Sequence, residues 1–293
     1  MIQNQLKKAI CFGEILWDNL PSGRLAGGAP MNVAYHLRKL GVDASLISRV
    51  GDDQAGRELI DFISSMDIPA ENIQIDTEQR TSEVVAELKE NNEMVYTITY
   101  PTAWDYIVWQ NDFEAKIANA DAFIFGSLSA RNEVSRATLL QLLEHAKFKV
   151  FDVNLRAPYY DKDSIATFLS HADFVKLNEN EIAMLGDWFT AQHHERSVVT
   201  ALMEKFQLSE ILITKGADGG TYYNTNQRIN YQAEKVVVVD TVGSGDSFLA
   251  AFLSKKLAGE EIVYCLNFAA KVAGFVTSQK GACPSYDTAS LGF

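Results

Sequence analysis

Four consecutive residues, Gly243-Ser244-Gly245-Asp246, combine a turn of small residues with a carboxylate. An apolar β-branched run at residues 236–239 precedes them and is typical of a buried strand, and a helical pattern begins at about Ser247. The first N–H groups of a helix have no partner within it, and the helix dipole adds about half a positive charge there. Because small residues leave the backbone accessible, this turn predicts an anion-binding site.

Asp246 places a negative charge beside that anion site. A carboxylate there repels a phosphate unless it has a chemical task, and deprotonating the group that attacks the phosphate is such a task. The alternative from these residues alone is a tight turn followed by an ordinary acid near a helix cap. The functional interpretation predicts phosphoryl transfer.

Composition excludes several other kinds of protein. The chain has 293 residues, of which 47% are hydrophobic, enough for one large α/β domain or two small ones. Its formal net charge of −12 argues against nucleic acid or an anionic membrane as the main partner. An anionic substrate therefore needs a local positive or dipolar site.

The cysteines and the apolar segments of the sequence bear on where in the cell the protein is expected. The three cysteines, Cys11, Cys265 and Cys283, have neither metal-ligand spacing nor a disulfide pattern. The N-terminal residues lack the apolar segment of a signal peptide, and no apolar run approaches the ~18 residues of a membrane helix. We therefore expect a protein of the reducing cytoplasm, with no membrane partner.

Strand and helix patterns alternate regularly after residue 120, which predicts a mostly parallel sheet with helices on both faces. In such folds ligands bind beyond the carboxyl ends of the strands, so polar residues there are candidates for a site. The expected strands cover 122–125, 150–153, 174–177 and 211–214, and the expected helices cover 134–146, 162–170, 179–185 and 198–206.

Two motifs more than 200 residues apart carry a family resemblance. The segment 240–253 resembles the second signature of the PfkB, or ribokinase-like, sugar kinases. The segment 27–34, Gly-Gly-Ala-Pro-Met-Asn-Val-Ala, with Gly41 and Gly51 at the matching spacing, resembles the first signature. Similar matches at D-x-N-x-R (152–156), N-x-x-E (178–181) and the nucleotide loop (214–220) extend the resemblance over about residues 9 to 286.

The resemblance implies a three-layer α/β/α fold with a mostly parallel central sheet and a small β-sheet lid. One kinase domain would span residues 1–293, with the lid formed by about 14–25 and 81–100 inserted in it. An edge hairpin of the main sheet is the alternative for residues 81–100.

The resemblance also implies site residues. Asp246 would be the base, backbone N–H groups of Gly243, Ser244 and Gly245 would stabilise the transferring phosphoryl group, and Arg156 would pair with a phosphate. Four residues would bind the sugar, and for Trp104 a core or interface role is equally expected. These are Asp18, Gly28, Asn32 and Trp104.

The implied cofactors are ATP and Mg²⁺, with K⁺ in some members of the family. ATP would contact Thr214, Gly216, Gly219 and Asn178. Glu181 would help place Mg²⁺ through water, since this ion keeps much of its hydration shell. Asp240 and backbone carbonyls near Val242 and Ala282 could hold K⁺. Taken singly, polar residues after a strand, such as Arg156 and Glu181, are more often loop or cap residues.

Among the substrates of the family, the sequence favours fructose with fructose 6-phosphate as product. The segments Gly-Glu-Ile-Leu-x-Asp (13–18) and Pro-Thr-Ala-Trp-Asp (101–105) resemble bacterial fructokinases. The alternatives are a kinase for ribose, 2-keto-3-deoxygluconate or a nucleoside, and a non-catalytic sugar or nucleotide sensor on the same fold. A homodimer through the lid is expected by the same resemblance.

Overall fold

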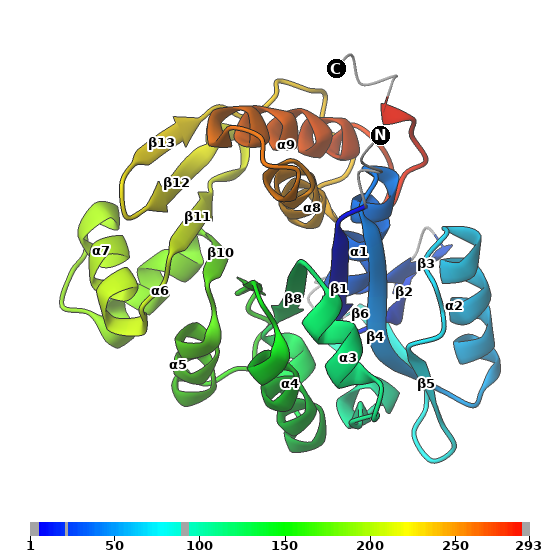
Figure 1. The fold of residues 1–293 in the computed structure, drawn as a ribbon. Coiled ribbons are helices and arrows are strands. Elements are labelled where there is room, and N and C mark those ends of the chain that lie inside the picture. Colours follow the sequence, from blue (N-terminus) through cyan, green and yellow to red (C-terminus); the bar gives the residue numbers. More distant parts are fainter. Residues whose placement is uncertain (1–5, 21–22, 89–93, 289–293) are drawn as a thin grey trace, which may run out of the picture.

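The computed structural model describes residues 6–20, 23–88 and 94–288. Its main sheet has nine strands in the order β13-β12-β11-β10-β9-β8-β1-β4-β5 (Figure 1). All neighbours are parallel except the β11–β12 and β12–β13 pairs at one edge. The strands are β1 (Lys8–Phe12), β4 (Asp43–Gly51), β5 (Ile73–Asp76), β8 (Ala122–Gly126), β9 (Lys149–Asp152), β10 (Phe174–Asn178), β11 (Glu210–Thr214), β12 (Gly220–Asn224) and β13 (Arg228–Tyr231).

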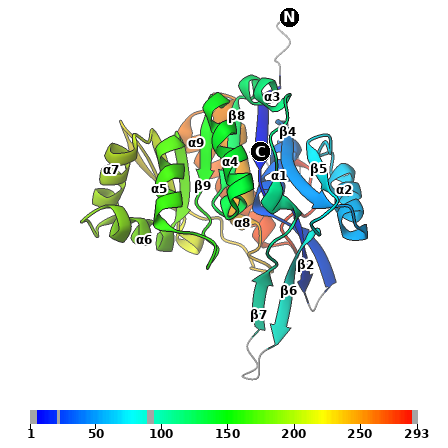
Figure 2. The same ribbon diagram turned by 90° about the horizontal axis from the view of Figure 1, so that it is seen from below.

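Helices cover both faces of this sheet, as the strand–helix alternation predicts (Figures 1 and 2). Alternate residues of β1 enter two separate cores: Ala9 and Cys11 join one, Ile10 and Phe12 the other. The first core packs against α1 (Ala29–Lys39), α2 (Gln54–Ser65), α8 (Ser244–Leu257) and α9 (Ile262–Thr277). The second packs against α3 (Phe113–Asn119), α4 (Glu133–His145), α5 (Lys162–His171), α6 (Glu179–Phe189) and α7 (Glu195–Phe206).

A second, four-stranded sheet stands apart from the main one in the order β3-β2-β6-β7. Its strands are β2 (Leu16–Leu20), β3 (Gly23–Gly27), β6 (Ser82–Leu88) and β7 (Met94–Ile98). Figure 2 shows β6 and β7 extending away from the helices. The small separate sheet implied by the resemblance is therefore present, and residues 81–100 are not an edge hairpin of the main sheet.

The prediction of a buried strand at residues 236–239 is wrong. This segment follows β13 and pairs with none of the described strands, and Val237, Val238 and Val239 are 82%, 63% and 61% exposed. Its connection to the fold includes the N–H of Val239, which donates to the carbonyl of Thr277 at 2.9 Å. A short apolar run does not by itself distinguish a core strand from an extended surface segment, and β13 already completes this edge of the sheet.

Candidate active site

The turn before α8 has the backbone that the sequence predicts. Gly243 has φ 76° and ψ −2°, in the left-handed region. A β-carbon there would lie 2.6 Å from Cα of Ala282, so both backbone conformation and space require glycine. Ser244 then begins α8, and Asp246 lies in its first turn. The helix start therefore offers N–H groups to an anion with a carboxylate beside them.

Asp246 is half-buried and meets a residue 214 positions away in the sequence. Nδ2 of Asn32 donates to Oδ2 of Asp246 at 2.8 Å. Asn32 lies on α1, which packs against α8, and is 5% exposed. The structure thus brings together the candidate base and a candidate sugar-binding residue.

The pKa of Asp246 is raised to about 6, mainly by burial and further by the negative charge of Asp152. The Lys176 ammonium, the hydrogen bond from Asn32 and the Arg156 guanidinium lower this pKa. A carboxyl group with this pKa is ionised at neutral pH, yet is more basic than an ordinary aspartate. Both properties suit a general base.

We expect kcat/KM to fall about tenfold per pH unit below pH 6, because protonated Asp246 cannot accept a proton. The measurement is initial rate against pH at low sugar concentration. The same limb is expected near pH 6 in Glu14→Gln, which removes a buried carboxyl group near Asp246 whose own pKa is raised to about 7. A limb near pH 4 in the native enzyme would contradict the raised pKa.

Lys176 and Asp152 form a buried ion pair beside this turn, and the sequence analysis did not assign either residue to the site. Nζ of Lys176 donates to both carboxylate oxygens of Asp152 at 2.9 Å, with side chains 9% and 6% exposed. Nζ also lies 3.3 Å from the place a β-carbon on Gly245 would take. Burial lowers the pKa of Lys176, but Asp152, Asp246 and Glu181 outweigh it, so the lysine stays charged. A lysine inside the apolar strand 174–177 was the available signal.

Glu14, just after β1, is a third residue that the sequence analysis did not assign to the site. It is 4% exposed, and its Oε2 has no hydrogen-bond partner among the residues that the structure describes. Burial raises its pKa to about 7, and the nearby Asp246 carboxylate adds to this, while the Arg156 guanidinium lowers it. A second carboxyl group therefore titrates near neutral pH close to Asp246.

Asp18 and Gly28 lie where the small sheet joins the main fold. Oδ2 of Asp18, on β2, lies 2.5 Å from the position of a β-carbon on Gly27, so its carboxylate covers the turn into α1. Gly28 has φ 119°, and a β-carbon there would lie 2.3 Å from the carbonyl oxygen of Glu14. Burial raises the pKa of Asp18. The structure thus places Asp18 next to the turn from which α1, with Asn32, begins.

Asn178 and Glu181 form a capping box at the start of α6. Oδ1 of Asn178 accepts from the N–H of Glu181 at 2.9 Å, and Oε2 of Glu181 accepts from the N–H of Asn178 at 2.8 Å. Oε1 of Glu181 also accepts from the N–H of Leu155 at 2.9 Å, which fixes the loop carrying Arg156. The Arg156 side chain is exposed, and its Nη1 donates to the carbonyl of Leu155 at 3.2 Å. The motif at 178–181 and the motif at 152–156 are thus joined by a hydrogen bond, which holds the loop that carries Arg156 against the start of α6.

The candidate nucleotide loop follows β11, which ends at Thr214. Gly216 and Gly219 have φ 53° and 80°, and the N–H of Lys215 donates to the carbonyl of Gly219 at 2.8 Å. A β-carbon on Gly219 would lie 2.1 Å from the carbonyl oxygen of Tyr231, whereas nothing lies within 4 Å at Gly216. Gly219 is therefore required by packing, and Gly216 leaves open space at the loop surface.

Asp240 joins the two segments proposed to hold K⁺. Its Oδ1 accepts from the N–H of Val242, and its Oδ2 from the N–H of Gly281, both at 3.0 Å. Nε2 of buried His36 lies 2.9 Å from the carbonyl oxygen of Ala282. Both carboxylate oxygens of Asp240 and the carbonyl oxygen of Ala282 therefore already have hydrogen-bond partners within the protein. Over residues 6–20, 23–88 and 94–288, no cluster of three or more His, Cys, Asp and Glu side chains could hold a metal.

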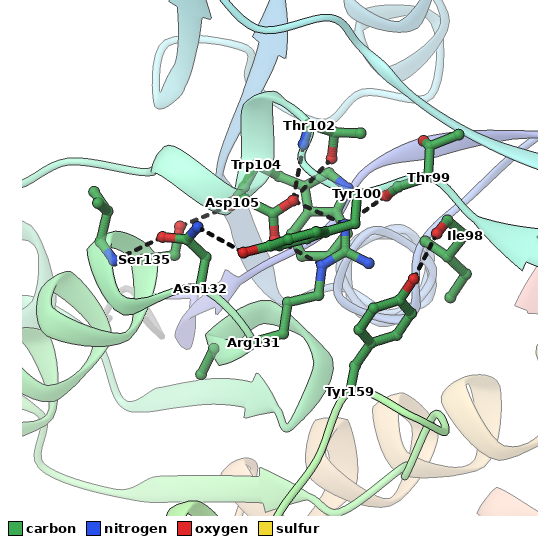
Figure 3. Close-up of polar contacts among 12 residues, drawn as sticks. Ile98, Thr99, Tyr100, Thr102, Trp104, Asp105, Arg131, Asn132, Ser135 and Tyr159 are labelled. Atoms are coloured by element: carbon green, nitrogen blue, oxygen red, sulfur yellow. Dashed lines mark hydrogen bonds and ion pairs between the residues drawn. The ribbon is translucent and has the colours of Figure 1, made fainter.

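The assignment of Trp104 to the sugar is wrong, and the core alternative holds. Trp104 lies in a short 3₁₀ turn, Ala103–Tyr106, and is fully buried. The guanidinium of Arg131 covers its ring at 3.9 Å from the ring centroid (Figure 3). No face of the indole is left for a ligand, because the residues after β7 fold inward against α4.

The α/β/α architecture, the separate small sheet and the carboxylate at the start of α8 define a ribokinase-like phosphotransferase. A family model described as pfkB family carbohydrate kinase matches residues 22–289. The chain belongs to this family and is a carbohydrate kinase. None of the helices in the described part of the chain is both long and apolar enough to span a membrane.

Relatives and solved structures agree with this assignment. The chain is 30% identical to a fructokinase of Klebsiella pneumoniae over 83% of this chain and 82% of that protein. It is 28% identical to probable fructokinase-5 of Arabidopsis thaliana over 95% and 94%. A Vibrio cholerae fructokinase mutant, solved with fructose, ADP and potassium, superposes with a TM-score of 0.82 at 23% identity over 98% and 97%. A sugar kinase of Pyrococcus horikoshii, solved with ATP, gives 0.80 at 26% over 97% and 96%.

Proposed function

We propose that this protein transfers the γ-phosphate of MgATP to D-fructose, giving fructose 6-phosphate and ADP. The observation that carries the proposal is the half-buried Asp246 carboxylate at the N-terminus of α8, hydrogen-bonded to Asn32. The fructokinases among its relatives support fructose as the acceptor.

Asp246 takes the proton of the attacking hydroxyl group, so that a new O–P bond forms as the bond to ADP breaks. The N–H groups of Gly243, Ser244 and Gly245 stabilise charge on the transferring phosphoryl group. Lys176 lies close to Gly245 and adds a fixed positive charge, while the exposed Arg156 pairs with a phosphate. Asp18, Gly28 and Asn32 bind hydroxyl groups of the sugar.

ATP contacts the loop with Thr214, Gly216 and Gly219, and Asn178 lies at the end of the adjacent strand. When bound, Mg²⁺ neutralises phosphate charge. The phosphates and water would hold this ion, with Glu181 in its outer shell, since Mg²⁺ keeps much of its hydration shell. Asp240 and carbonyls near Val242 and Ala282 fit K⁺.

The sheet of β2, β3, β6 and β7 acts as a lid over the sugar and excludes water. Residues 1–293 form one kinase domain with this lid inserted. Pairing of two lids gives a homodimer, and the net charge of −12, with no apolar membrane segment, fits a cytoplasmic enzyme without a nucleic-acid partner. Sedimentation of the purified chain tests the dimer.

A panel of sugars with MgATP tests the reaction. We expect the highest kcat/KM with D-fructose, and NMR of the product should show phosphate on O6. Higher kcat/KM with ribose, 2-keto-3-deoxygluconate or a nucleoside would reassign the acceptor. Absence of sugar-stimulated ADP release would favour a sensor and contradict the proposed function.

A further inference from the structure

We propose that Tyr159 and Arg131 are positioning residues that hold the end of the lid strand β7 and connect the lid to the Arg156 loop. This inference rests on the proposed function, because it assigns the small sheet the role of a lid. Tyr159 donates a hydrogen bond to the carbonyl of Ile98, and Arg131 donates one to the carbonyl of the next residue, Thr99, where the chain leaves β7 (Figure 3).

The pair of Arg131 and Tyr159 is called the anchor below, and Arg131 is its fixed part. Its Nε and Nη2 donate to the two carboxylate oxygens of Asp105 at 2.7 and 2.8 Å, and both side chains are at most 1% exposed. Nη2 also donates to the carbonyl of Thr99 at 2.6 Å. A bidentate pair of this kind has one well-defined geometry, so the guanidinium cannot follow the lid without breaking it.

Aromatic rings enclose the same guanidinium. Its carbon lies 3.9 Å from the ring centroid of Trp104, 4.5 Å from that of Tyr159 and 4.9 Å from that of Tyr100. The buried Trp104, unsuited to a sugar, thus has a place in this anchor. Cation–π contacts add to the rigidity of a buried guanidinium.

Asp105 is in turn fixed to the main domain. Its Oδ2 accepts from the N–H of Thr102 at 2.9 Å in a capping box. The hydroxyl of Ser135, on α4, donates to the carbonyl of Trp104 at 2.7 Å and accepts from the N–H of Ile107 at 2.8 Å. The segment after β7 is therefore bound to α4, and it gives the end of β7 a rigid base.

Tyr159 connects this base to the phosphate side of the site. Its hydroxyl donates to the carbonyl of Ile98 at 2.9 Å, and its N–H donates to the carbonyl of Arg156 at 2.8 Å. One residue therefore contacts both the lid strand and the loop that carries Arg156. A displacement of β7 must move the Arg156 turn or break one of these bonds.

Loosening this anchor should affect the sugar more than the nucleotide. The lid covers the sugar, whereas the ATP loop follows β11, four strands away from β1 in the main sheet. A looser lid binds sugar more weakly and admits water as a competing acceptor. The expected signature is a raised KM for sugar, an unchanged KM for ATP and faster ATP hydrolysis without sugar.

Tyr159→Phe is the decisive variant, because it keeps the ring over Arg131 and removes only the hydroxyl bond to Ile98. We expect the KM for fructose to rise about three- to tenfold, the size of effect that one neutral hydrogen bond supports. Sugar-independent ATP hydrolysis should rise relative to kcat, and the KM for ATP should stay constant. Tyr160→Phe is the matched control, since its ring packs against Trp188 at 6.0 Å and should give native values.

Hydrogen exchange gives a readout that does not depend on catalysis. Without substrates, the amides of β7 and of Thr99, Tyr100 and Thr102 should exchange faster in Tyr159→Phe, and faster still in Arg131→Lys, than in Tyr160→Phe. Equal exchange and equal fructose KM in Tyr159→Phe and Tyr160→Phe would overturn the anchor while leaving the kinase intact. Inactivity of the native enzyme with every sugar would instead reject the proposed function, and the exchange data would still test the anchor.

Discussion

Asp246→Asn should lower kcat about 10²- to 10⁴-fold, the range that a positioned general base contributes. The amide has nearly the same shape, but it cannot accept the hydroxyl proton. Because Asp246 is not part of the ATP loop, the affinity for ATP should be retained. Turnover by ADP release and ATP binding by calorimetry measure the two effects separately.

Asp61→Asn, on the exposed face of α2, is the control for this variant and should keep native turnover. Native turnover in Asp246→Asn itself would remove the residue from the role of base. A parallel loss of ATP affinity would mean that the variant disturbs the whole helix start, and the assignment would then need the pH profile for support.

Lys176→Met should lower the free energy of unfolding by about 3–5 kcal/mol, because it leaves the Asp152 carboxylate buried without a partner. It should also move the acidic limb of the pH profile above pH 6, since the lysine ammonium lowers the pKa of Asp246. Denaturant unfolding measures the first effect, and kcat/KM against pH measures the second.

Two further variants isolate the buried pair. Lys149→Met removes a partly exposed lysine whose Nζ lies 3.8 Å from Asp173, and it should cost at most about 1 kcal/mol. Asp152→Asn combined with Lys176→Met should regain most of the stability that Lys176→Met loses, because no buried carboxylate is then left without a partner. A single Lys176→Met variant as stable as Lys149→Met would show that the buried pair contributes little.

The sequence predicted the fold well because its signals were local and mutually consistent. Glycines at 28 and 243 belong to the two motifs that carry the resemblance, and the structure gives each a positive φ and a protein neighbour that excludes a β-carbon. The alternation of strands and helices after residue 120 predicted the parallel sheet because the periodicity of apolar residues identifies each helix or strand from its own short segment.

What the sequence could not supply was the set of contacts between distant segments. Lys176 acquires its importance only when β9 and β10 pair in register and place it against Asp152. Trp104 carries the same aromatic signal whether it meets a sugar or a guanidinium, and only the position of Arg131, 27 residues further along, decides. The valines at 237–239 were predicted to be buried but are exposed, because apolar side chains do not by themselves specify a partner to pack against.

The contact between Gly243 and Ala282 has a consequence for synthesis of the chain on the ribosome. Residues 281–284 are translated after Asp18, Asn32, Arg156 and Asp246, yet they complete the turn through bonds to Asp240, His36 and Tyr35. A nascent chain that has already formed α1 and α8 still lacks this closing segment. On the proposed function, we expect a chain that ends before residue 281 to leave this turn unclosed and to transfer no phosphate.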